Sequence, residues 1–173
     1  VGTIDDGSFN EGSYDGVKQY GDEHKVGYDY YRPAAEDDEA YYEEISKAIN
    51  DGGAKIIVTP GFMFEKAVHR AQTDFPETHF IILDGAPRAG QGEPDDIKEN
   101  TYSIVYEEHQ AGFLAGYAAV KEGFTKLGFV GGMKVPAVER FGIGYVAGAE
   151  TAAKEMNVKV DMRYHYAATF VPS

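Results

Sequence analysis

Residues His79-Phe-Ile-Ile-Leu-Asp-Gly85 form a short apolar run that ends in a carboxylate and a glycine. A run of this kind predicts a buried strand of a parallel sheet. Its last residues then place Asp84 at the carboxyl edge of the sheet, where open α/β folds bind their ligands. Asp84 is therefore a candidate ligand-binding residue. Taken alone, it is equally compatible with an Asp that stabilises its own turn.

The same kind of run recurs along the chain. Apolar, β-branched runs bounded by Gly, Pro and Asp alternate with segments of helical period, which is typical of βαβ units. The predicted strands are Lys25–Tyr30, Lys55–Thr59, His79–Asp84, Thr101–Val105, Lys126–Val130 and Val158–Tyr164. The predicted helices are Asn10–Tyr20, Asp38–Asp51, Phe62–Thr73, Glu107–Glu122 and Arg140–Met156. We therefore expect an α/β fold with a parallel sheet between two helical layers.

Composition excludes several classes of function. At 173 residues, 43% of them hydrophobic, the chain is long enough to bury a core. Its formal charge of −13, from 16 Lys and Arg against 29 Asp and Glu, would be repelled by a phosphate backbone, so nucleic acid is not an expected partner. The absence of cysteine excludes disulfides, thiolate metal sites and cysteine nucleophiles. No apolar run approaches the roughly 18 residues of a membrane helix.

The pattern also predicts the domain organisation. A helix rich in small residues ends at Gly123, and a new strand-helix-strand series follows, so we expect one part over residues 1–124 and another over residues 125–173. Only Val1–Ile4 precede the first helix, where a doubly wound sheet normally has its opening strand. The last strand runs into Ala167–Ser173 and stops. The expected sheet is therefore incomplete at both ends, and its open strand edges could pair with a second copy.

The opening segment Val1–Asn10 carries chemistry suited to a ligand. Carboxylates at Asp5 and Asp6 can accept hydrogen bonds or hold a cation, Phe9 offers an apolar face, and Asn10 both donates and accepts. The alternative is a helix-entry loop in which Ser8 or Asn10 caps the helix.

Other motifs weigh against specific enzymes. Gly142-Ile-Gly-Tyr-Val-Ala147 fits a dinucleotide fingerprint, but no strand feeds directly into it, so the small residues within Gly142–Ala153 more simply let a helix lie close to the sheet. The histidines are widely separated and predict no metal site, and we expect no cofactor. A Mg²⁺-dependent enzyme built on Asp5, Asp6 and Asp84 stays open as an alternative. A ligand-sensing regulatory domain of the same fold is another.

Four segments together resemble a known family. They are Gly2–Asn10, Phe80–Gly85, Glu108–Ala119 and Leu127–Met133, with Phe141–Gly148 beyond. In order and spacing they are similar to the basic membrane protein family, the PnrA-like substrate-binding lipoproteins of bacterial ABC transporters. The resemblance implies a type I periplasmic-binding-protein fold and a protein that is not an enzyme. It also implies an extracytoplasmic, membrane-anchored lipoprotein that passes its ligand to an ABC permease.

The resemblance further implies a ligand and the residues that bind it. Members of this family close two lobes on a nucleoside, often a purine nucleoside, with the base between aromatic rings and the ribose hydroxyls held by carboxylates. Carried over by position, Phe9 would stack on the base, Asn10 would hydrogen-bond to it, and Asp84 would take part from the next strand. Phe170 would supply the opposing aromatic ring from the second lobe. The family's Asp at the end of its first strand would lie immediately before Val1.

Overall fold

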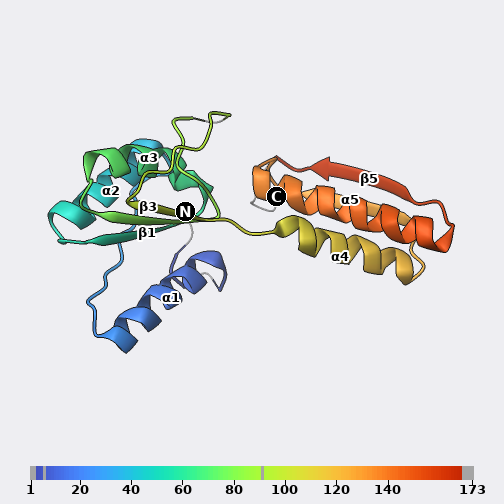
Figure 1. Cartoon of the computed structure of the whole chain (residues 1–173), viewed down its shortest axis with the longest axis horizontal. Helices are drawn as coiled ribbons and strands as arrows, with labels where there is room; N and C mark the ends of the chain where they lie inside the picture. The colour runs from blue at the N-terminus through green and yellow to red at the C-terminus, as the bar shows by residue number, and fades with distance from the viewer. Residues whose placement is uncertain (1–2, 6, 91, 169–173) are drawn as a thin grey trace. The chain divides into compact units, whose positions relative to one another are not determined.

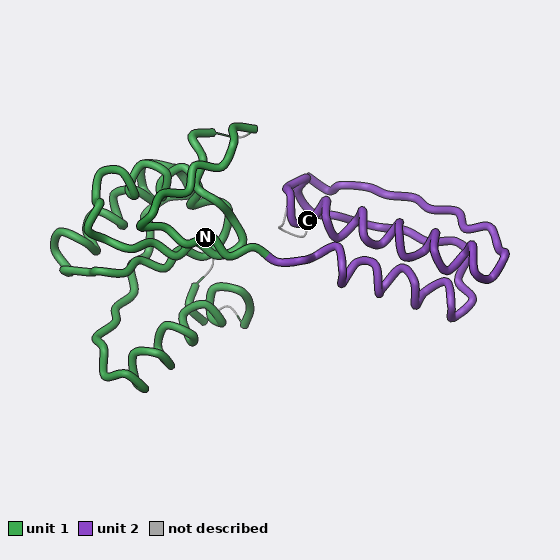
Figure 2. The backbone as a smooth tube through the Cα atoms, viewed as in Figure 1, with its two compact units in different colours: residues 1–105 green, residues 106–173 purple. Residues whose placement is uncertain are grey.

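The computed structural model describes residues 3–5, 7–90 and 92–168. The chain divides into two compact units, unit 1 over residues 1–105 and unit 2 over residues 106–173 (Figure 2). Each unit has its own parallel sheet and its own buried cluster of apolar side chains. The predicted α/β class with parallel strands is confirmed.

In the described part of unit 1, three parallel strands lie side by side in chain order. They are β1 (Ile56–Pro60), β2 (His79–Leu83) and β3 (Thr101–Ile104). Its helical elements are α1 (Phe9–His24), α2 (Asp38–Asn50), the short 3-10 helix η1 (Phe62–Phe64) and α3 (Glu65–Asp74). Helices α2 and α3 cover one face of the sheet, while α1 lies on the other side of β1 (Figure 1).

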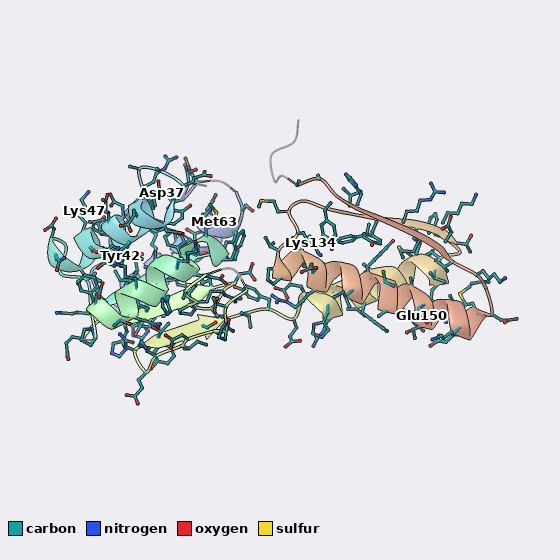
Figure 3. The ribbon with its side chains drawn as sticks, turned by 90° about the horizontal axis from the view of Figure 1, so that it is seen from above. Asp37, Tyr42, Lys47, Met63, Lys134 and Glu150 are labelled. Atoms are coloured by element: carbon teal, nitrogen blue, oxygen red, sulfur yellow. The ribbon has the colours of Figure 1, made fainter. Side chains whose placement is uncertain are left out.

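Apolar side chains at helical and strand periods form the core of unit 1. On α2 they recur every three or four residues, and on β1 and β2 every second residue, so each element turns one apolar face inward. The buried members are Tyr41, Ile45, Ala48, Ile57, Ala67, Val68, Ala71, Phe80 and Ile82. Asp37 caps α2 by accepting the Ala40 N–H at 2.9 Å, and Figure 3 shows it beside the start of that helix.

The predicted strand Lys25–Tyr30 is wrong. Residues 26–33 form no strand, because a strand exists only through its ladder and no strand among the described residues pairs with this segment. The segment instead packs on α1, where the rings of Tyr28 and Tyr30 lie edge-on to Tyr14, with centroids 6.3 and 5.9 Å away. Gly21 makes room for Tyr28, since a Cβ there would overlap the Tyr28 ring.

The described residues of unit 2, 106–168, form two helices and two parallel strands. They are α4 (Glu108–Lys121), β4 (Lys126–Gly131), α5 (Pro136–Met156) and β5 (Asp161–Tyr166). Its core is small and rich in alanine, with Val120, Ala149, Ala152 and Ala153 buried. Helix α5 begins four residues before the predicted start at Arg140, with Pro136 in its first turn, a position that suits proline because the missing N–H has no helical partner there.

Glycines bring α4 and α5 into backbone contact. A Cβ on Gly112 or Gly116 of α4 would lie closer than 3.0 Å to the backbone of α5, and one on Gly144 or Gly148 would meet the backbone of α4 as closely. The two helices therefore approach more closely than ordinary side chains allow.

The close packing of α4 on α5 explains where the two units divide. The sequence pattern placed the boundary at Glu122–Thr125, after this helix, whereas the compact units divide between Val105 and Tyr106. Helix α4 belongs with unit 2 because its buried face is against α5. Arg140 of α5 also donates to both oxygens of the buried Glu108 carboxylate, at 2.5 and 2.9 Å, and so ties down the start of α4.

Within the described part of the chain, every helix is too short or too polar to cross a membrane.

Candidate ligand-binding site

Phe9 lies at the carboxyl end of strand β1. It is the first residue of α1, and 39% of its surface is exposed. Its ring atom Cε1 lies 4.0 Å from the position that a Cβ would take on Gly61, the residue that follows β1. Gly61 has φ +101°, a conformation that a side chain would strain, so the turn beside the Phe9 ring favours glycine.

The start of α1 is held without the predicted side-chain cap. Ser8 occupies the N-cap position, but its side chain makes no capping hydrogen bond. The Glu11 carboxylate instead accepts the Gly7 N–H at 2.6 Å, so the loop closes on the first turn of the helix. Asn10 lies half-buried in the same turn. Phe9 and Asn10 are therefore presented by a fixed helix end.

Asp84 comes directly after the last residue of β2. Its N–H donates to the Ile104 carbonyl at 2.7 Å, and the Leu83 carbonyl accepts the Gly61 N–H at 2.7 Å. The turns that follow β1 and β2 are thus hydrogen-bonded neighbours. Because Phe9 lies against Gly61, the structure brings Phe9 and Asp84 to the same edge of one sheet.

Asp84 also has an unusual backbone conformation. Its φ is +54°, in the left-handed region that glycine adopts freely and other residues adopt at a cost of about 1–2 kcal/mol. Asp tolerates this region better than most residues because its short side chain can bond locally. A left-handed residue at the carboxyl edge of a sheet is a reason to look for function.

Three charged residues beside this turn were missed by the sequence reasoning. Glu65, the first residue of α3, accepts the Ala86 N–H at 3.2 Å and pairs with Arg88 Nε at 3.0 Å. Arg88 in turn reaches Asp95 at 2.9 Å. The sequence predicted only a surface loop over Arg88–Glu99. The opposite charges within this loop were the local feature that could have indicated its ion pairs.

The environment of Glu65 shifts its titration. Burial raises the pKa of the Glu65 carboxyl above its ordinary value, and this outweighs the lowering by the Ala86 N–H and by Arg88. The folded state therefore holds this proton more tightly than the unfolded chain does. The Glu65 carboxyl therefore contributes its full stabilisation below the pKa that it has in the unfolded chain. This contribution is lost as the pH rises through the pKa that it has in the folded state.

This sign gives a testable pH dependence. We expect the free energy of unfolding of the wild type, minus that of Glu65→Gln, to decrease as pH rises from about 4 to about 7, because only the wild type has the titrating carboxyl. Urea unfolding at a series of pH values measures the difference. A difference that grows with pH would contradict the prediction and show that ion pairing with Arg88 dominates.

Unit 2 has a hollow of about 410 Å³ at the carboxyl end of β4. Its lining is apolar and aromatic and comes from α4, β4 and α5: Ala111, Gly112, Ala115, Phe129, Val130, Gly131, Gly132, Val138, Phe141 and Tyr145. Sequence reasoning did not single out these aromatic residues. Phe170, which it did single out, lies outside the described residues.

The glycines of the apparent dinucleotide fingerprint have structural roles. Gly142 and Gly144 lie inside α5, after its start at Pro136, and not in a strand-to-helix turn. A Cβ on Gly142 would come within 3.0 Å of the Phe129 ring, and Gly144 faces the backbone of α4. Gly142 thus lets α5 lie close to the sheet, as predicted, whereas Gly144 serves the packing of α5 on α4, which the sequence did not predict.

Among the described residues, which leave out Asp6, no three His, Cys, Asp or Glu side chains are grouped so that they could hold a metal ion.

Comparison with known proteins identifies relatives over nearly the whole chain. A family model described as "ABC transporter substrate-binding protein PnrA-like" matches residues 1–170. The "ABC transporter nucleoside-binding protein BmpA" of Lactococcus lactis is 30% identical over 93% of this chain and 44% of its own length. "Basic membrane protein A" of Borreliella burgdorferi is 30% identical over 94% of this chain and 45% of its own length. The chain thus spans about half the length of these curated relatives.

Solved structures share the fold. A solute-binding protein of an ABC transporter system from Aeropyrum pernix superposes with a TM-score of 0.77 at 24% identity, over 96% of this chain and 45% of that one. A sugar-binding transcriptional regulator of the LacI family from Escherichia coli superposes with a TM-score of 0.59 at 13% identity, over 91% of this chain and 53% of that one. Since the family model covers nearly every residue, the chain belongs to the PnrA-like family of ABC transporter substrate-binding proteins.

Proposed function

We propose that this protein captures a nucleoside, with a preference for purines, between two lobes and delivers it to an ABC permease. Unit 1 would belong to the first lobe and unit 2 to the second. The observation that carries the proposal is the shared sheet edge of Phe9 and Asp84 in a chain of this family. An aromatic face and a carboxylate are the two groups that a base and a ribose require.

Each group has a distinct part in the proposed site. Phe9, partly exposed at the start of α1, would stack on the base, and Asn10 in the same turn would hydrogen-bond to it. Asp84 would accept hydrogen bonds from ribose hydroxyls, an interaction that orients the sugar and is stronger because the acceptor is charged. Phe170 would face Phe9 across the ligand. No covalent change is involved, so the protein would act by binding and closure.

The remaining parts of the proposal concern location and partners. The protein would be extracytoplasmic and held at the membrane by a lipid anchor, as the family resemblance implies. Self-association stays a prediction: β1 and β3 are the edge strands of the described three-stranded sheet in unit 1. Sedimentation of the full-length protein over a concentration series tests it, and a constant monomer mass would contradict it.

The direct test is calorimetric titration of the full-length protein with adenosine, guanosine, inosine, cytidine and the free bases. We expect heat with purine nucleosides and a weaker response with free bases, which lack the ribose hydroxyls. Absence of heat with every nucleoside, from protein that is folded by circular dichroism, would overturn the proposal. Binding of Mg²⁺ with turnover of a substrate would favour the enzyme alternative.

Phe9→Ala should weaken nucleoside binding by roughly 1–3 kcal/mol through lost stacking and apolar burial. The fold should be nearly unaffected because the side chain is partly exposed. Tyr20→Ala is a suitable control, since it removes a more exposed aromatic side chain near the other end of α1. Unchanged affinity in Phe9→Ala would remove Phe9 from the site.

A further inference from the structure

In the turn after β2, the residue with the left-handed backbone conformation is an aspartate, although the next residue is a glycine. Asp84 has φ +54°, whereas Gly85 lies outside the left-handed region. Glycine at position 84 would adopt this conformation without strain. The chain therefore keeps a carboxylate where the backbone alone would favour glycine, which points to a role for the side chain.

Gly85 is required for a different reason. A Cβ at this position would lie 3.1 Å from Phe62 Cα and 3.2 Å from Glu65 Oε1. The peptide after Asp84 thus runs tightly against η1 and the start of α3. Gly85, Ala86 and Pro87 are all buried, so the turn is packed inside unit 1 and is not a loose surface loop.

Two side chains hold the peptide groups that follow Asp84. Ser103 of β3 donates its hydroxyl to the Gly85 carbonyl at 2.6 Å, and the Glu65 carboxylate accepts the Ala86 N–H at 3.2 Å. They come from separate elements on either side of the turn. Together with the Asp84 N–H, which donates to Ile104, they fix three consecutive residues.

Glu65 is itself held in place. Arg88 Nε lies 3.0 Å from its second oxygen, and Arg88 continues to Asp95 at 2.9 Å. The Glu65 and Arg88 side chains are only 18% and 22% exposed, so this pair is better shielded from solvent than the pair of Arg70 with Glu39, which are 51% and 74% exposed. Burying part of a carboxylate costs free energy because the group loses water. The bonds of Glu65 to one backbone N–H and one guanidinium offset this cost.

We infer that Glu65 and Ser103 are positioning residues that hold the turn after β2 so that the Asp84 carboxylate meets the hydroxyls of the ligand in a fixed orientation. The inference rests on the function proposed above and extends it to residues that do not touch the ligand. Groups that lock a binding side chain in place sustain affinity because the protein has less freedom to lose on binding.

The test uses the full-length protein and inosine as the probe. Glu65→Ala removes the acceptor for Ala86 and the partner of Arg88, and Ser103→Ala removes the donor to Gly85 with little change in volume. We expect each to raise the Kd on the order of tenfold, the lower end of the effect seen when the partners that orient metal-binding side chains are removed. Titrations are run at a temperature where circular dichroism shows every variant fully folded.

Two further variants separate positioning from general stability. Glu65→Gln keeps an amide oxygen that can accept the Ala86 N–H, so it should recover most of the affinity lost in Glu65→Ala. Glu39→Ala removes an exposed glutamate of α2 that pairs with Arg70 of α3. This variant should bind inosine as tightly as the wild type does.

The outcomes distinguish this inference from the function on which it rests. If the wild type binds inosine and both Glu65→Ala and Ser103→Ala bind it equally well, the positioning role is overturned and the function stands. A lower melting temperature with unchanged affinity also overturns it, because the residues would then only stabilise the fold. If Glu65→Ala does not fold, Ser103→Ala decides alone. If the wild type binds no nucleoside, the proposed function fails.

Discussion

Replacing Gly116 by alanine is expected to destabilise unit 2 by roughly 3 kcal/mol, the upper end of the range for overpacking. The added methyl group would lie closer than 3.0 Å to the backbone of Tyr145 and 3.0 Å from the backbone nitrogen of Ala149, both on α5. Backbone cannot rotate away as a side chain can, so the helices would have to separate and pack less tightly along their length. Urea unfolding followed by circular dichroism measures the change.

Gly16→Ala is the matched control for this experiment. Gly16 also lies inside a helix, α1, but no atom stands within 4 Å of the position its Cβ would take. The same substitution should therefore stabilise the protein, by about 0.5–1 kcal/mol, because alanine is the better helix former. Opposite signs from the two substitutions would establish that helix packing decides the effect. A neutral Gly116→Ala would refute the close approach of α4 and α5.

Asp84→Gly is expected to separate binding from stability. Loss of the carboxylate should weaken nucleoside binding by about 1.5–3 kcal/mol, the usual contribution of a hydrogen bond to a charged group. The free energy of unfolding should not fall. A non-glycine residue pays about 1–2 kcal/mol for the left-handed conformation, and glycine avoids this cost, which offsets the loss of the side chain from the turn. Calorimetric titration and urea unfolding of the same samples measure the two effects.

Asp84→Asn provides the control for charge. Asparagine also tolerates the left-handed region, so the fold should be kept, while the amide is a weaker acceptor than the carboxylate. Its affinity should lie between those of the wild type and Asp84→Gly. If Asp84→Gly binds as tightly as the wild type, Asp84 takes no part in the site and its conformation serves only the turn.

Local patterns were enough to predict most of the secondary structure. The strands β1 to β4 lie within one residue of their predicted bounds, and β1, β2 and β4 are short apolar runs closed by glycine, proline or a charged residue. Strand β5 begins three residues after its predicted start at Val158. The segment Lys25–Tyr30 was predicted on the same grounds and forms no strand. A strand needs a partner, and whether one is present is not a property of the segment itself.

The candidate site was also predicted only in part from the sequence. The position of Asp84 at the carboxyl edge of the sheet followed from the sequence, since it ends an apolar run. Glu65 and Ser103 could not be recognised in this way, because they lie 21 and 18 residues from the turn residues that they bond. Their side chains reach that turn only through the packing of α3 and the register of β2 with β3.

The sequence by itself determined the α/β class, the order of the elements apart from the segment Lys25–Tyr30, and the sheet edge that carries Asp84, because these depend on periodicity and on residues close together in the chain. Only the tertiary structure decided that α4 belongs with unit 2, that Phe9 lies beside Gly61, and that Asp84 takes the left-handed conformation. These features depend on interactions between elements distant in the chain. Such interactions form only when the elements pack, so no local pattern encodes them.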